Sequence, residues 1–200
     1  VGSHNLLILY LAIELTSYSS YLLTGFDFKE KGSEAALKYL LFGGLSSAVM
    51  LFGISLLYGA HHSLYLHDME FSMLDVMGLL FFLSGLFFKT AIVPFHIWIP
   101  TTYQGAPTDA VAFFATVPKI AGFAALYHVF KWADELFNPF LEHLILLLAI
   151  LTILWGTLSA LRQTNVKRML SYGVMAHSGF ILPFCLHMET YSLFKYYVII

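Results

Sequence analysis

The sequence predicts an all-α fold, a polytopic transmembrane helical bundle that contains one broken helix. The composition is 59% hydrophobic and only 11% charged, with a mean hydropathy of +0.78, whereas a soluble domain carries about 25% charged residues. The apolar residues fall into runs near the length of about 20 residues that crosses a hydrocarbon core. One of these runs contains Lys89 and, shortly after it, Pro94, a residue that interrupts helices.

Six apolar runs and the start of a seventh follow one another along the chain. They are too long and too uniformly apolar for the strands of a membrane barrel, so helices are the structures that span. We expect the spans at Leu6 to Leu23, Ala35 to Tyr58, Met73 to Ile99, Ala110 to Trp132, Pro139 to Leu161, Met169 to His187, and from Tyr191 onward.

The connections between the runs are short, polar and turn-like. We expect them at Phe26 to Ser33, Gly59 to Ser72, Pro100 to Asp109, Ala133 to Asn138, and Arg162 to Arg168. Alternate connections differ in charge, because Lys29, Lys31, Arg162, Lys167 and Arg168 would lie on one side and only Lys131 on the other. The positive-inside rule places the loops after the first, third and fifth spans in the cytoplasm or its organellar equivalent.

The chain starts without Met, runs almost at once into an apolar segment and ends inside another. Nothing in it has the charged start, short apolar centre and small-residue cleavage site of a signal peptide. We therefore expect residues 1–200 to form a single membrane domain that is an interior fragment of a longer polytopic protein.

Composition excludes several classes of function. A net charge of −2 without a basic patch argues against nucleic acid as a partner. Cys185 is the only cysteine, so the chain cannot build a cysteine-ligated iron–sulfur cluster or zinc site. It also lacks a GxGxxG dinucleotide fingerprint. We expect no metal and no cofactor bound by this chain, and no redox chemistry within it.

Lys89, Lys119 and Glu14 fall near the middle of their predicted spans. At 1.5 Å rise per residue, Lys119 lies roughly 15 Å from either membrane boundary. A charge at that depth is costly and typically marks an ion or proton path. Burial disfavours the charged form of a lysine and a nearby carboxylate favours it, so a Lys–Glu contact that opens and closes switches proton affinity. The alternative is a static ion pair that holds helices together.

Pro94 removes a hydrogen bond to the carbonyl of Thr90, directly after Lys89, so we expect the helix to break there. Pro118, directly before Lys119, is a candidate for a second break. His96 is a natural proton carrier, or else an interfacial histidine bonded to backbone. His177 is a further possible relay residue. Lys38 lies only a few residues after the start of its span, where its side chain can reach the headgroups. Composition alone therefore indicates a structural role.

Three stretches carry a family resemblance. The run from Phe87 to Phe123, FFKTAIVPFHIWIPTTYQGAPTDAVAFFATVPKIAGF, resembles the central motif of the antiporter-like membrane subunits of respiratory complex I, the proton-pumping NADH:quinone oxidoreductase. IELTSYSSYLLTGF with the following EAALKYLLFGG, and LWGTLSALRQTNVKRMLSYGVMAHSGF, agree with it. The YQGAP within the first stretch points to the subunit N branch. The resemblance covers essentially the whole chain.

The resemblance implies roles position by position. Glu14 matches the family's buried glutamate in the fifth helix, and Lys89 matches its partner lysine in the broken seventh helix. Lys38 falls on a lysine of the sixth helix, which changes its interpretation to a half-channel residue. Lys119 matches the connecting lysine of the eighth helix, and His96 matches a histidine on the path between the two lysines.

The resemblance also implies the domain organisation: family members contain two inverted five-helix repeats, each with one broken helix. Residues 1–132 would then form most of the first repeat, with helices five to eight, and residues 139–200 the start of the second. The chain departs from the usual TPDVYQGAP pattern by having Thr101 in place of an acidic residue, so a loop role for that acid is in doubt.

The implied function is proton translocation through a Glu/Lys/His relay, driven by quinone reduction in other subunits that hold NADH, FMN, iron–sulfur clusters and a quinone. The expected partners are other membrane subunits of complex I and the lipid bilayer, in a multi-pass protein of the bacterial inner (plasma) membrane. An Mrp-type cation/proton antiporter, a membrane subunit of a related hydrogenase, and a purely structural scaffold remain as alternatives.

Overall fold

The structure is a computed structural model that describes residues 3–65, 73–133 and 139–186, and the regular elements in those ranges are α-helices. Six of the helices are long and apolar enough to cross a membrane, which confirms the all-helical prediction. The apolar run from Tyr191 lies outside the described residues. The helices are α1 (Leu6–Thr24), α2 (Glu30–His61), α3 (Met73–Thr90), α4 (Trp98–Gly105), α5 (Thr108–Trp132), α6 (Pro139–Leu161) and α7 (Val166–Leu186).

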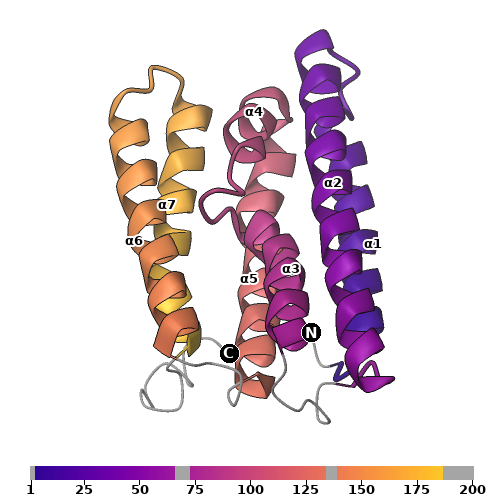
Figure 1. The fold of residues 1–200 in the computed structure, drawn as a ribbon. Helices are drawn as coiled ribbons and strands as arrows, with labels where there is room; N and C mark the ends of the chain where they lie inside the picture. The colour runs from indigo at the N-terminus through magenta and orange to yellow at the C-terminus, as the bar shows by residue number, and fades with distance from the viewer. Residues whose placement is uncertain (1–2, 66–72, 134–138, 187–200) are drawn as a thin grey trace.

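The six long helices run side by side with alternating direction (Figure 1). The α1–α2 pair and the α6–α7 pair lie on opposite sides of α3 and α5, and the short α4 lies at the end of the bundle where α1 joins α2 and α6 joins α7. The basic residues in and next to these two connections therefore gather at one end, as the alternation of charge predicts. Two of them hold α4 in place: Lys167 donates to the carbonyl of Ala106 (2.9 Å), and Arg168 donates to Gln104 (3.3 Å).

Three predicted boundaries are wrong. Helix α7 begins at Val166 rather than at Met169, so Lys167 and Arg168 lie in its first turn and not in the connection. The segment from Pro100 to Asp109 is not a turn, because α4 occupies most of it, and α2 begins at Glu30 rather than at Ala35. Hydropathy missed these stretches because polar residues such as Glu30, Lys31 and Gln104 occur within them. Glu30 lies in the first turn of α2, where a negative charge favours helix formation, and Pro100 lies in the first turn of α4, where proline is tolerated.

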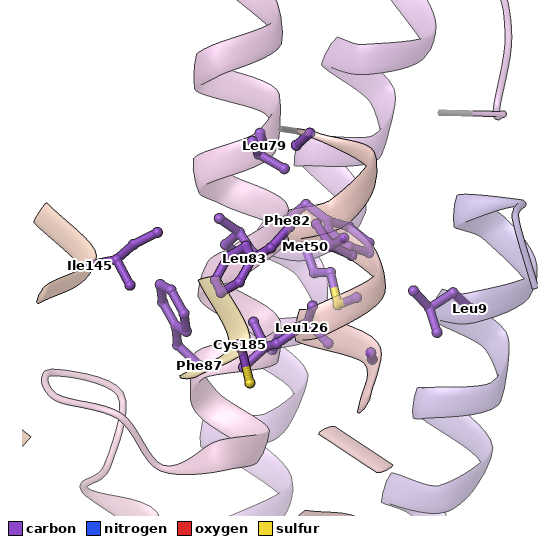
Figure 2. Packing of buried hydrophobic residues seen from close by; sticks show 14 of the residues in the cluster. Leu9, Met50, Leu79, Phe82, Leu83, Phe87, Leu126, Ile145 and Cys185 are labelled. Carbon is purple, nitrogen blue, oxygen red and sulfur yellow. The ribbon is translucent and has the colours of Figure 1, made fainter. Parts of the chain in front are cut away.

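Buried apolar side chains form two clusters. The larger one joins the six long helices and includes Leu9, Met50, Phe82 and Leu126. Figure 2 shows Met50, Phe82 and Leu126 near the middle of the view, with Cys185 of α7 beside Leu126, and Leu9 of α1 and Ile145 of α6 on opposite sides. The smaller cluster is rich in aromatic rings and surrounds Tyr39, Phe88 and Trp98. The second cluster lies against the break between α3 and α4, and it forms part of the candidate site.

Helices α2 and α3 approach each other closely at two glycines. A Cβ on Gly53 would lie 2.6 Å from both the carbonyl oxygen of Gly78 and the backbone nitrogen of Phe82, and a Cβ on Gly78 would lie 2.7 Å from the side chain of Leu57. Small residues at such crossings let membrane helices pack backbone to backbone. This contact fixes α3, and therefore Lys89, relative to α2.

We predict that Gly53→Ala destabilises the full-length protein by about 1–3 kcal/mol, because the added methyl group meets backbone that cannot move aside. Thermal unfolding of the purified full-length protein in detergent measures the change. Gly59→Ala is the matched control in the same helix, since a Cβ on Gly59 meets nothing within 4 Å. Equal unfolding temperatures for the two variants would contradict the packing.

Candidate functional site

The centre of the site is the break between α3 and α4. Helix α3 ends at Thr90, directly after Lys89, and α4 begins at Trp98. Ala91 is completely buried and has a φ of 59°, in the left-handed region that a residue with a Cβ seldom adopts. Pro94 has no N–H to offer the carbonyl of Thr90. The break that Pro94 predicts is therefore present, beside the lysine.

Three polar groups from elsewhere in the fold bind the backbone that the break frees. The Lys119 ammonium of α5 donates to the carbonyl oxygen of Thr90 (2.6 Å). The indole N–H of Trp98 donates to the carbonyl of Phe88 (2.8 Å), and the hydroxyl of Thr152 on α6 accepts from the Val93 N–H (3.0 Å). Buried backbone groups require such partners, because leaving them unpaired costs about 1–3 kcal/mol each.

Lys119 is buried, with 6% of its surface exposed. Its ammonium also lies 5.9 Å from the ring centroid of Trp98. Gly122, one turn further along α5, permits this approach, because a Cβ there would lie 2.9 Å from the Thr90 methyl group. The second break suggested at Pro118 is wrong: α5 continues through it, since neighbouring helices support a proline inside a membrane bundle.

Lys89 lies among aromatic rings. Its ammonium is 5.5 Å from the ring centroid of Tyr21, 5.8 Å from that of Tyr39 and 5.6 Å from that of Phe88. Ring faces attract a cation without removing its proton. Among the described residues, no ion pair within 4.0 Å joins Lys89 to Glu14. Glu14 instead accepts a hydrogen bond from the hydroxyl of Ser47 on α2 (2.5 Å).

Four rings connect the surroundings of the two lysines, and we call Tyr21, Tyr39, Phe88 and Trp98 the aromatic box. Tyr39 and Trp98 are stacked, with centroids 4.4 Å apart and planes 6° apart, and Tyr21 meets Tyr39 edge to face at 4.7 Å. Lys89 therefore lies over one end of the box and Lys119 over the other. Sequence reasoning missed the box, because aromatic residues are common throughout these spans.

One sequence signal for the box exists in retrospect. Tyr21 follows Glu14 by two helical turns, on the same face of α1, and both are buried. A Cβ on Gly43 of α2 would lie 2.0 Å from the Tyr21 hydroxyl oxygen, so the glycine makes room for the ring. A glycine opposite a buried tyrosine identifies a constrained ring only when the helix pairing is already known.

Lys89 also borders a pocket of about 220 Å³ between α1, α3 and α5. Pro118 and Gly122 supply its α5 wall, and Lys89 and Thr16 are its polar lining residues. The pocket gives the ammonium a second environment besides the aromatic box.

The other predicted relay residues are not beside the two lysines. Lys38 is exposed near the start of α2, where it pairs with Glu34. His96 lies within the break but faces α6, with its ring 5.8 Å from that of Trp155. His177 is on the exposed face of α7. Of the predicted residues, Glu14, Lys89, Pro94 and Lys119 lie at or beside the break; Glu14 and Lys119 are buried, Lys89 is half-buried and Pro94 is exposed. The structure does not bring the other three to the two lysines.

Comparison with known proteins identifies the family. A family model described as the transmembrane region of NADH:quinone oxidoreductase/Mrp antiporter proteins matches residues 3–200. The chain belongs to this family. It is a multi-pass membrane protein, with six candidate spans in the described residues. Its helices form a fragment of the antiporter-like fold of complex I membrane subunits.

Relatives of this family member include both sequences and solved structures. NADH-quinone oxidoreductase subunit N of Azoarcus sp. is 40% identical over 191 residues, which is 91% of this chain and 39% of the relative. A chain of respiratory complex I from Thermus thermophilus has a TM-score of 0.81 at 40% identity, covering 90% of this chain and 40% of that one. A chain of the Mrp complex from Dietzia sp. has a TM-score of 0.83 at 20% identity, covering 92% of this chain and 36% of that one, a likeness of fold alone.

The chain thus spans about two fifths of the length of the curated relatives that it matches. It is a homologue of NADH-quinone oxidoreductase subunit N over that part.

We predict that Trp98→Phe destabilises the full-length protein by about 1 kcal/mol, because the indole hydrogen bond to the Phe88 carbonyl is lost while the ring stacking and the bond from the Ala91 N–H to the same carbonyl remain. Trp155→Phe is the control: Trp155 is more than half exposed, its indole N–H has no hydrogen bond among the described residues, and phenylalanine keeps a ring against His96. Thermal unfolding in detergent compares them. A loss of stability in the Trp155 variant that equals the loss in the Trp98 variant would show that the break does not depend on this bond.

Proposed function

We propose that this chain is part of subunit N of a proton-translocating NADH:quinone oxidoreductase, in which it moves protons through a buried relay of Glu14, Lys89 and Lys119. Quinone reduction in other subunits supplies the energy, and those subunits hold the NADH, FMN and iron–sulfur chemistry. The other membrane subunits of complex I are the proposed partners, in the bacterial inner membrane. The subunit N identity of the relatives at about 40% supports this choice.

One observation carries the proposal. Lys119 of α5 donates to the Thr90 carbonyl, which is the backbone group next to Lys89 and the one that Pro94 leaves without a helical donor. A buried lysine of α5 and a half-buried lysine of α3 thus meet at the same break. Broken helices at membrane depth line ion and substrate paths in transporters, and ionisable groups held there are functional by default.

Glu14 gives the relay its switch. A nearby carboxylate favours a charged lysine, while burial alone favours the neutral one. With Glu14 bonded to Ser47 and Lys89 held among rings, the ion pair is open. Closing it would make Lys89 take up a proton, and opening it would make the same proton easier to pass toward Lys119.

The exposed first turns of α2 are the proposed place where the proton enters. Lys38 lies there with Lys31 and Arg168 around a pocket of about 270 Å³, at the end of the bundle where basic residues gather. We propose that protons enter on this side. His96 faces α6, and His177 is on the outer face of α7. His96 is proposed as a carrier between Lys89 and Lys119, and His177 as a further relay residue in the second repeat.

We predict that Lys89→Ala or Glu14→Gln lowers proton pumping roughly tenfold or more, when each is made in the full-length protein within its native complex. Without one of these groups the proton has no adjacent carrier to which it can be transferred. Inverted membrane vesicles measure pumping, alongside the rate of NADH:quinone reduction. Lys131→Gln is the matched control: this exposed lysine lies in the last turn of α5.

Unchanged pumping and unchanged turnover in both variants would contradict the relay. Unchanged pumping with a lower unfolding temperature would instead support a structural scaffold. Cation-dependent proton exchange in vesicles that contain no flavin or iron–sulfur subunits would favour an Mrp-type antiporter.

A further inference from the structure

We propose that Thr152 of α6 is a positioning residue for proton transfer: it holds the break in the arrangement that lets Lys119 bind the Thr90 carbonyl. This inference rests on the proposed function, since it concerns how the same site is controlled. It assigns a role to a residue that lies in the expected second repeat and whose hydrogen bonds in the described residues go to Val93 and Leu148 rather than to either lysine.

The hydrogen bonds of Thr152 give it a fixed orientation. Its hydroxyl donates to the Leu148 carbonyl of its own helix (2.6 Å) and accepts from the Val93 N–H (3.0 Å). The side chain is completely buried. Because the hydroxyl proton is committed to Leu148, Thr152 is built to hold Val93 rather than to pass a proton.

The Val93 N–H is the backbone donor that the break turns outward. The N–H groups of Ala91, Ile92 and Phe95 bind carbonyls of Phe88, Phe87 and Ile92, within the same segment. Val93 binds another helix, and Pro94 follows without an N–H. The hydrogen bond from the Val93 N–H to Thr152 therefore connects the broken segment to α6, in the expected second repeat.

Val93 and Thr90 are three residues apart in a segment that has little freedom. Ala91 and Ile92, between them, are completely buried, and the Thr90 hydroxyl binds the Leu86 carbonyl (2.9 Å). A shift of Val93 therefore moves the Thr90 carbonyl relative to Lys119. One helical turn beyond Thr152, Trp155 meets His96 of the same segment, so the same face of α6 contacts the break twice.

This geometry makes α6 a means of coupling the two repeats. Helix α6 packs closely along α7, where a Cβ on Gly156 would lie 2.8 Å from the Ala176 backbone nitrogen. A movement of the α6–α7 pair would act on the break through Thr152 and change the distance between Lys119 and the carbonyl it binds.

The test uses Thr152→Val in the full-length protein within its native complex. Valine keeps the shape but cannot accept the Val93 N–H, so we expect protons pumped per electron to fall about tenfold, while the amount of assembled complex and the KM for quinone stay the same. Thr152→Ser, which keeps the hydroxyl, should restore pumping to near the unmodified level. Thr157→Val, an exposed threonine on the same helix, is the control and should pump normally.

A double-mutant cycle separates positioning from simple stability. If Thr152 acts through Lys119, the pumping losses of Thr152→Val and Lys119→Gln are not additive. Thr152→Ala is measured in parallel, so that a failure of the valine variant to assemble does not leave the result open. Normal pumping in the assembled Thr152→Val or Thr152→Ala variant overturns the inference, and so does full additivity of the pumping losses of Thr152→Val and Lys119→Gln. If Lys89→Ala and Glu14→Gln also pump normally, the proposed function itself has failed; if they do not, only the role of Thr152 has.

Discussion

The hydrogen bond from Lys119 to the Thr90 carbonyl is the interaction on which the rest of the site depends. A lysine ammonium and a backbone carbonyl are each costly to bury alone, and together each supplies the partner that the other lacks. The bond requires a helix that ends at Thr90, a glycine at position 122 and an α5 that lies close to α3. The fold meets all three conditions, and so the break in the helix after Thr90 and the buried charge of Lys119 stabilise each other.

The aromatic box gives this arrangement its second property: it lies between the two ammonium groups, and rings rather than a carboxylate surround Lys89. Rings hold the Lys89 ammonium by weak, non-directional attraction. Glu14 is held separately by a serine hydroxyl. In the part of the chain that the structure describes, neither lysine forms a salt bridge within 4.0 Å, which is the arrangement that the proposed relay requires.

Sequence reasoning reached the parts of this account that follow from local chemistry. Hydropathy located the spans, the depth of Lys89 and Lys119 marked them as unusual, and Pro94 predicted the break, because these signals lie within one stretch of chain. Hydropathy could not place α4, whose residues extend beyond the apolar run. It also could not find Thr152 or Tyr21, since a threonine or a tyrosine in an apolar helix gains meaning only from the helix that faces it. The roles of Lys38, His96 and His177 came from the resemblance or from residue type, and they stay predictions.

The most direct test of the relay is the number of protons moved per electron in a Lys119→Met variant of the full-length protein, assembled in its native complex. Methionine keeps an apolar stem of similar length but has no ammonium, so the Thr90 carbonyl loses its donor and the relay loses its second carrier. The account predicts a large fall in protons moved per electron, with the complex still assembled. The same ratio as in the unmodified protein would contradict it, because protons would then cross without the α5 side chain that donates to the Thr90 carbonyl.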